Sequence, residues 1–139
     1  MYGNYEDVCD YNSNTVENFA TTPYDDGRTY YVNNSYVLNA AINNCNSNSA
    51  FNQQQKINCA DGVNAASAQF EYGRDQFYKR NYDQNNTNKE CNQKYVADPR
   101  AAEICRAGVQ RGVADYAAYQ QSLLYGSYIL FFIYNIFYI

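Results

Sequence analysis

The chain has 139 residues, a length that suits one domain, and its 14 acidic and 10 basic side chains give a formal net charge of −4. It contains no His, which removes the commonest general base and the commonest metal ligand and argues against an enzyme, a metal site or a bound cofactor. The acidic balance argues against a nucleic-acid partner, and 17 Tyr, 20 Asn and 10 Gln favour a structural role without a small-molecule substrate.

Charge divides the chain into three parts. Residues 1–27 carry six acidic and no basic side chains, and residues 116–139 carry no charged side chain. We therefore expect an acidic extended N-terminal arm over residues 1–34 and a disulfide-stapled helical region over 35–122. A hydrophobic segment that contacts a membrane or a partner follows over 123–139.

The N-terminal arm is polar, and its aromatic side chains are too scattered along the sequence to form one face. Two interpretations stay open: a solvated tail, or an extended arm that lies across a neighbouring subunit with Tyr side chains as anchors. The stretch Pro23–Gly27 (PYDDG) is predicted as a turn by its composition. An acidic start is atypical of a secretory signal peptide, so we do not expect one.

The middle of the chain contains a repeated pattern. Cys45 and Cys59 are separated by 13 residues, and Cys91 and Cys105 by the same number, so a shift of 46 residues places one pair on the other. Windows of 28 residues that begin at the first cysteine of each pair share six identities. Composition alone gives about two, which favours an internal duplication. The two repeats are expected near residues 45–90 and 91–122.

Each repeat also contains a helical signal. Small and apolar residues recur in steps of four and three after the second cysteine of each pair, which places them on one stripe of a helix. We predict helices at about 52–82 and 98–125, joined by a loop at 84–89, and a shorter helix at about 35–45. The predicted fold class is therefore mainly α, a helical hairpin. Its interface is expected to consist of Val63, Ala66, Phe70, Phe77, Val109, Gly112, Tyr116 and Leu123.

The five cysteines allow three interpretations. A zinc site usually brings its ligands in short Cys-x2–4-Cys steps, which the sequence lacks, and a catalytic thiol has no His to activate it. Disulfides are the best interpretation, with free buried thiols as the alternative. If the residues before each long helix fold back, Cys45 can pair with Cys59 and Cys91 with Cys105, which leaves Cys9 unpaired.

The spacing of these two cysteine pairs resembles the twin-cysteine helical-hairpin proteins of the mitochondrial intermembrane space, the coiled-coil-helix group. That resemblance implies oxidised cysteines, and it implies the pairing of Cys45 with Cys105 and of Cys59 with Cys91. The chain departs from the family pattern in its longer spacing. It also departs in Pro99, which disfavours one continuous helix from Cys91 to Cys105.

The C-terminal segment 123–139 reads LLYGSYILFFIYNIFYI and carries no charge. At about 1.5 Å per residue, the whole uncharged stretch is long enough as a helix to cross a bilayer. Three interpretations stay open: a membrane-spanning helix, a strand donated to a partner's sheet, or a segment docked in a subunit groove. All three need a partner, because so large an apolar surface aggregates in water. The expected contact residues are Ile129, Leu130, Phe131, Phe132, Ile133, Ile136, Phe137 and Ile139.

These features predict a non-enzymatic structural subunit of a large assembly, whose partners are other structural proteins or, through its C-terminal segment, a lipid membrane. The Asn-rich, Tyr-rich composition with a hydrophobic tail resembles minor capsid proteins of large DNA viruses, which implies a place in the virion at the capsid or internal membrane. An accessory subunit of a protist mitochondrial membrane complex, with its cysteines in the intermembrane space, is the alternative. Sequons at Asn33 and Asn85 suit a third class, secreted glycoproteins.

Overall fold

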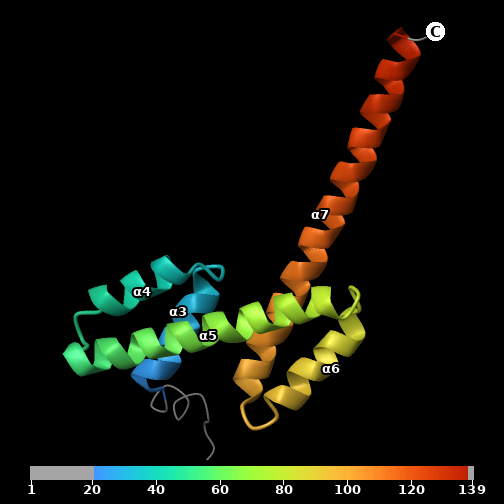
Figure 1. Ribbon diagram of the computed structural model, residues 1–139. Helices are drawn as coiled ribbons and strands as arrows, with labels where there is room; N and C mark the ends of the chain where they lie inside the picture. The colour runs from blue at the N-terminus through green and yellow to red at the C-terminus, as the bar shows by residue number, and fades with distance from the viewer. Residues whose placement is uncertain (1–20, 138–139) are drawn as a thin grey trace, which may run out of the picture. The chain divides into compact units, whose positions relative to one another are not determined.

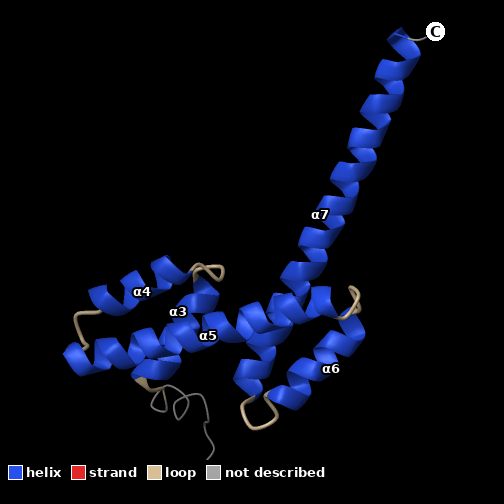
Figure 2. Ribbon diagram, in the orientation of Figure 1, coloured by secondary structure: helices blue, strands red, loops and turns tan. Residues whose placement is uncertain are grey.

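The computed structural model describes residues 21–137, and within that range every regular element is an α-helix (Figure 2). The mainly α fold class predicted from the sequence is therefore confirmed for this part of the chain. The helices, labelled in Figure 1, are α3 (Pro23–Asn33), α4 (Leu38–Ser47), α5 (Gln53–Lys79), α6 (Gln84–Lys94) and α7 (Pro99–Phe137).

The chain divides into two compact units, and the boundary between them falls within the sequence of α5. Unit 1 ends at Ser67 and unit 2 begins at Ala68. The described part of unit 1 consists of α3, α4 and the first part of α5, whereas unit 2 consists of the rest of α5, α6 and α7. In unit 1 α3 packs on α4, and in unit 2 α6 packs on α7. Each unit is thus built from three helical segments, which differs from the predicted two-helix hairpin.

The same turn ends the first helical segment of both units. Ser35 and Tyr36 have φ angles of 56° and 64°, and Asn81 and Tyr82, 46 residues later, have φ angles of 57° and 62°. In each turn the tyrosine donates its backbone N–H to the carbonyl oxygen five residues earlier, with an N···O distance of 2.9 Å in both. This bond is typical of helices that end in the left-handed region. The repeated backbone structure supports an internal duplication.

The first and third helical segments of unit 1 cross at two glycines. A Cβ atom on Gly27 of α3 would lie 2.0 Å from the carbonyl oxygen of Cys59, and one on Gly62 of α5 would lie 2.0 Å from that of Tyr24. A real side chain does not fit at such distances, so only glycine lets the two backbones touch. The crossing therefore depends on one glycine from each helix.

Unit 2 contains the same crossing 46 residues later. A Cβ atom on Gly73 of α5 would lie 1.9 Å from the carbonyl oxygen of Cys105, and one on Gly108 of α7 would lie 1.9 Å from that of Phe70. The reciprocal arrangement brings each helix backbone against the other. Both units thus use one packing device, at positions that a 46-residue shift relates.

One disulfide in each unit joins the second helical segment to the third. Cys45 bonds to Cys59 and Cys91 bonds to Cys105, with a Cα–Cα distance of 5.7 Å in both. All four cysteines are fully buried. These are the pairings expected if the residues before each long helix fold back, and they differ from those implied by the resemblance to the twin-cysteine family. Cys9 lies outside the described residues.

The extended arm predicted over residues 1–34 is wrong for its last third, which forms α3. Thr22 caps this helix by accepting a hydrogen bond from the backbone N–H of Asp25 at 3.1 Å, and Pro23 occupies the first helical position. Both are helix-starting signals, so Pro23–Gly27 begins a helix and is not the predicted turn. The solvated-tail and arm predictions for residues 1–20 fall outside the described range.

The loop predicted at residues 84–89 is also wrong, because α6 begins there. Asp83 caps α6 by accepting a hydrogen bond from the backbone N–H of Asn86 at 3.1 Å. The predicted helix at about 35–45 exists as α4 but starts later, since the left-handed turn at Ser35 and Tyr36 comes first.

The C-terminal segment is helical through Phe137, which contradicts the interpretation of it as a donated strand. The interpretation as a membrane-spanning helix finds no support, since no helix among residues 21–137 has the length and apolar character needed to cross a membrane. The start of α7 agrees with the sequence: Asp98 accepts a hydrogen bond from the backbone N–H of Ala101 at 3.2 Å, and Pro99 is the first helical residue. Ile139 lies outside the described residues.

Candidate interaction surface on the C-terminal helix

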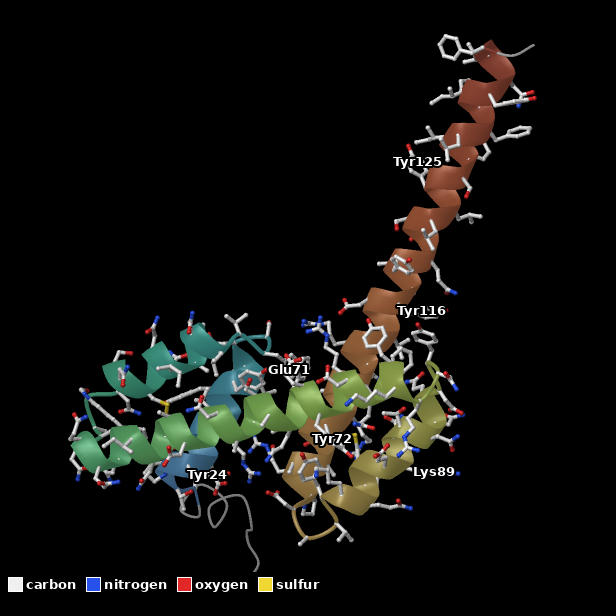
Figure 3. The ribbon with its side chains drawn as sticks, in the orientation of Figure 1. Tyr24, Glu71, Tyr72, Lys89, Tyr116 and Tyr125 are labelled. Carbon is white, nitrogen blue, oxygen red and sulfur yellow. A yellow bond between two sulfur atoms is a disulfide. The ribbon has the colours of Figure 1, made fainter. Side chains whose placement is uncertain are left out.

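The candidate site is the part of α7 that no other described element of unit 2 covers. Its residues 118–137, called here the α7 extension, continue beyond α5 and α6 (Figure 1). Thirteen large apolar side chains of this segment are between 41% and 74% exposed. In Figure 3, Tyr116 lies where α7 leaves the body of unit 2, and Tyr125 lies on the uncovered part. The extension therefore presents a large apolar surface to solvent.

Two of the few polar side chains in the extension are hydrogen-bonded within the helix itself. Ser122 donates its hydroxyl to the carbonyl oxygen of Tyr119 at 2.8 Å, and Asn135 donates its amide N–H to that of Phe131 at 2.8 Å. A polar group that keeps its hydrogen bond costs little when it leaves water. These two residues therefore do not prevent the extension from being buried against a partner.

The apolar residues of the extension lie on all sides of the helix, and none of its side chains is charged. A helix of this type is stable in proteins when other groups surround it. Large exposed apolar patches mark interaction sites on soluble proteins. The extension therefore has the exposed, uncharged apolar surface that is typical of an interaction site.

A polar cluster joins α5 to α6 within unit 2. The Tyr72 hydroxyl donates a hydrogen bond to Glu90 at 2.8 Å, and Arg80 forms an ion pair with the same carboxylate at 3.0 Å. The Lys94 ammonium lies 4.6 Å from the centre of the Tyr72 ring, within range of a cation–π interaction. The cluster brings together two basic side chains, one carboxylate and one phenol (Tyr72 is labelled in Figure 3).

The pKa values of this cluster follow from burial and hydrogen bonding. Burial, together with the hydrogen bond to the Glu90 carboxylate, raises the pKa of Tyr72 to about 12. Burial also acts to raise the pKa of Glu90, but the hydrogen bonds from Tyr72 and Arg80 outweigh it, and the pKa lies below its usual value. At neutral pH the phenol is therefore protonated and the carboxylate charged. Both states favour the hydrogen bond and the ion pair that connect α5 and α6.

An open polar hollow of about 680 Å³ lies over the turn between α5 and α6. Its lining includes Lys79, Asn86 and Lys89, the last of which is labelled in Figure 3. Within residues 21–137, no group of three or more His, Cys, Asp or Glu side chains is placed to hold a metal ion. The hollow is wide and lined by exposed side chains, so the extension is the stronger candidate site.

Several of the residues predicted to form the helix interface meet in unit 2. Phe77 and Val109 belong to one buried cluster, and a ring carbon of Phe77 lies 2.9 Å from the position of a Cβ atom on Gly112. Phe77 also packs edge-on against Tyr116, with ring centres 6.4 Å apart. Phe70 is almost fully buried. The structure thus brings α5 and α7 together along these residues.

The other predicted interface residues lie elsewhere. Val63 and Ala66 are fully buried in unit 1, where the backbone nitrogen of Val63 lies 3.1 Å from the position of a Cβ atom on Gly27. Val63 is therefore packed beside α3. Leu123 is 53% exposed, so its predicted place in a hairpin core is wrong. The predicted docking residues 129–133, 136 and 137 all belong to the extension and are exposed.

Sequence reasoning finds Gly73 on one helical stripe and Gly108 beside the other, where small residues let helix backbones approach closely, but it misses Gly27 of unit 1. The signal is present in the sequence, because Gly27 and Gly73 are 46 residues apart, as the two cysteine pairs are. Arg28 and Arg74 share this spacing, but residues 27 and 28 precede the window that begins at Cys45, and residues 73 and 74 precede the window that begins at Cys91. Extending the comparison toward the N-terminus finds them.

No protein-family model, curated protein or solved structure matches the chain. The role of the α7 extension is therefore inferred from its own chemistry. That chemistry is an uncharged helical segment whose large apolar side chains are exposed.

Proposed function

We propose that the protein is a non-enzymatic structural subunit, and that its α7 extension attaches it to another protein subunit of a larger assembly. The observation that carries this proposal is the exposure of thirteen large apolar side chains on one uncharged helical segment. Burying half of them, at about 2 kcal/mol each, supplies on the order of 10 kcal/mol before the cost of association. This gain is of the same order as the cost of association, so burial of more than half of these side chains favours attachment.

The body of unit 2, to which α7 belongs, suits a rigid base for this attachment. Each unit has a buried disulfide and a crossing in which two helix backbones touch. Disulfides persist in oxidising surroundings, so we expect the protein to work in such a compartment or particle. The extension is then a fixed projection on a cross-linked base.

The virion of a large DNA virus is the setting we propose first, because the composition resembles that of minor capsid proteins. A mitochondrial membrane complex with its cysteines in the intermembrane space is the alternative. Both settings are compatible with disulfides, and fractionation distinguishes them. The protein should sediment with virus particles in the first case and with mitochondrial membranes in the second.

The test compares the full chain with a truncated chain that lacks residues 123–139. Tagged versions are expressed in the native cells, and large assemblies are separated from free protein by density-gradient sedimentation. The full chain is expected in the assembly fraction and the truncated chain in the free fraction, because the truncation removes most of the apolar surface. Both disulfides precede the truncation, so non-reducing peptide mapping and circular dichroism show whether the remaining helices still form.

A chain that lacks residues 1–20 is the matched control, because the sequence also allows attachment through an N-terminal arm. We expect it to stay in the assembly fraction. If the chain without 123–139 incorporates as well as the full chain, attachment through the extension is wrong. If the full chain itself sediments as free protein, the structural role is wrong.

A further inference from the structure

The start of the α7 extension lies 46 residues after the first helical segment of unit 2, as that segment lies 46 residues after α3. Tyr31 and Phe77 are related by the 46-residue shift and are 1% and 2% exposed. A further shift of 46 residues leads to Leu123, which is 53% exposed. The position that is core in both complete units is therefore uncovered here.

The extension cannot be covered by a helix that crosses it at a glycine, as the first helical segment of each unit is. The crossing glycines Gly27 and Gly73 correspond to Tyr119 after the further shift. A tyrosine at the crossing point keeps two helix backbones apart, since only glycine fits against a carbonyl oxygen 1.9 to 2.0 Å from its Cβ position. A partner of the extension must pack on it in another way.

Two hollows along the extension indicate how a partner helix can pack on it. The first, of about 330 Å³, is lined by Ala118, Gln121, Ser122 and Tyr125. The second, of about 270 Å³, is lined by Tyr125, Tyr128, Ile129 and Phe132. In both sets of four, the residues are spaced by three, one and three positions, which is the spacing of the hole that receives a side chain in a coiled coil.

The second hollow repeats the first one a heptad later along the helix, as each lining residue lies seven positions after its counterpart. Both hollows therefore share one coiled-coil register. In that register the central stripe of the helix advances in alternating steps of four and three, which is the pattern of a coiled-coil seam. The stripe consists of Ala118, Ser122, Tyr125, Ile129, Phe132 and Ile136, and it is called here the α7 seam.

We propose that the α7 seam binds the α7 seam of a second copy of this chain, so that the two extensions form a coiled coil. An identical helix presents side chains at the seven-residue spacing at which the hollows are repeated. The extension carries no charge, so two copies do not repel each other, and there is no charged pattern to select a foreign helix. This inference rests on the proposed structural role and names the partner of the extension.

The exposed area is sufficient for such a dimer. The large apolar residues on and directly beside the seam are 41% to 70% exposed: Tyr125, Tyr128, Ile129, Phe132, Ile133 and Ile136. At about 200 Å² for a fully exposed side chain of this size, they present on the order of 700 Å². A stable interface of standard size buries about 800 Å² on each partner. The seam and its flanking residues therefore supply nearly the area that two copies need.

The experiment measures the mass of the full-length oxidised protein in solution by sedimentation equilibrium over a range of concentrations. The variant Ile129→Glu places a carboxylate on the seam, and Leu124→Glu places one about 140° around the helix from it. Both side chains are exposed, at 41% and 73%, so neither change should unfold the chain, which circular dichroism checks. Leu124→Glu is therefore the matched control for charge and helix propensity.

We expect the wild type and Leu124→Glu to be dimers, and Ile129→Glu to dimerise at least about tenfold more weakly, or about 1.4 kcal/mol. Co-expressed copies with two different tags should purify together in the first two cases only. A wild-type chain that stays monomeric overturns the inference. Equal weakening by the two substitutions also overturns it, because the seam would then have no special role.

The gradient sedimentation described above separates this inference from the proposed function. If the wild type is monomeric but Ile129→Glu is lost from the assembly fraction, the partner is a different protein and the structural role stands. If Ile129→Glu breaks the dimer yet stays in the assembly fraction, self-association stands and attachment through the extension is wrong.

Discussion

Gly108 lies directly against the backbone of Phe70: a Cβ atom on the glycine would be 1.9 Å from the phenylalanine carbonyl oxygen. Because backbone cannot move aside as a flexible side chain can, we predict that Gly108→Ala forces α5 and α7 apart. The free energy of unfolding should fall by about 3 kcal/mol, at the upper end of overpacking effects. Urea denaturation followed by circular dichroism measures this.

Gly126→Ala is the matched control on the same helix, because a Cβ atom there meets nothing within 4 Å. Alanine is the better helix former, so this change should raise helix stability by up to about 1 kcal/mol. Opposite signs for the two substitutions are the expected result. A Gly108→Ala chain as stable as the wild type would show that the two backbones do not touch.

The disulfides should each make a comparable contribution to stability. Cys91 and Cys105 are 14 residues apart, and a cross-link that closes a loop of this length contributes about 3 kcal/mol on the chain-entropy model. Replacing both with alanine should lower the free energy of unfolding by about that amount. The same double replacement at Cys45 and Cys59, whose separation is also 14, is the internal comparison.

Because all four of these cysteines are fully buried, a mild reductant should not reach them in the folded protein. Free thiols should appear only as the helices unfold, which a thiol-reactive dye monitors alongside circular dichroism. Rapid reduction without loss of helicity would contradict the buried positions.

The hydrogen bond between Tyr72 and Glu90 should make stability depend on alkaline pH. The pKa of Tyr72 is raised from 10.0 to about 12 in the folded state, so the folded protein holds this proton more tightly than the unfolded chain. The contribution of Tyr72 is therefore complete below pH 10 and is lost as the pH rises toward 12. Tyr72→Phe should cost about 1.5 kcal/mol at neutral pH, as expected for a hydrogen bond to a charged group.

The measurement is the difference in unfolding free energy between the wild type and Tyr72→Phe, taken from pH 8 to pH 12. That difference should shrink over the upper part of the range. Tyr125→Phe, at a side chain that is 68% exposed on the extension, is the control and should show little difference at any pH. A difference for Tyr72→Phe that grows with pH would mean that the hydrogen bond favours the ionised phenol.

The left-handed turn of unit 2 should become more stable with a glycine. Asn81 has a φ of 57°, a conformation that costs L-residues about 1 kcal/mol and costs glycine almost nothing. We expect Asn81→Gly to raise the midpoint of thermal unfolding slightly. Asn85→Gly, within the regular helix α6, should lower it, and equal effects of the two changes would exclude relief of strain as the cause.

The sequence predicted well the features that depend on local spacing. The start of α7 at Pro99, after its cap Asp98, follows from residues next to each other in the chain. The pairing of Cys45 with Cys59 follows from the short distance between them and the expected start of the next helix. These features require no knowledge of distant contacts.

The sequence predicted poorly the elements that are stabilised by contacts with other helices. Residues 84–94 are mostly polar and show no helical stripe, yet they form α6 because Thr87 and Cys91 are buried, the latter by its disulfide. Tyr72 and Glu90 are 18 residues apart, so nothing in the local sequence pairs them. Their partnership exists only because α6 folds back on α5.

By itself, the sequence determined that residues 21–137 are mainly helical, that the two cysteine pairs repeat at a spacing of 46 residues and that the C-terminal segment is uncharged, because composition and spacing carry those properties. Only the tertiary structure decided that Gly27 and Gly108 are crossing points, and that Leu123 is exposed where Phe77 is buried. The physical reason is that burial and close approach require two helices in contact. A periodic stripe predicts which face of one helix is apolar, but whether another helix covers that face depends on the rest of the fold.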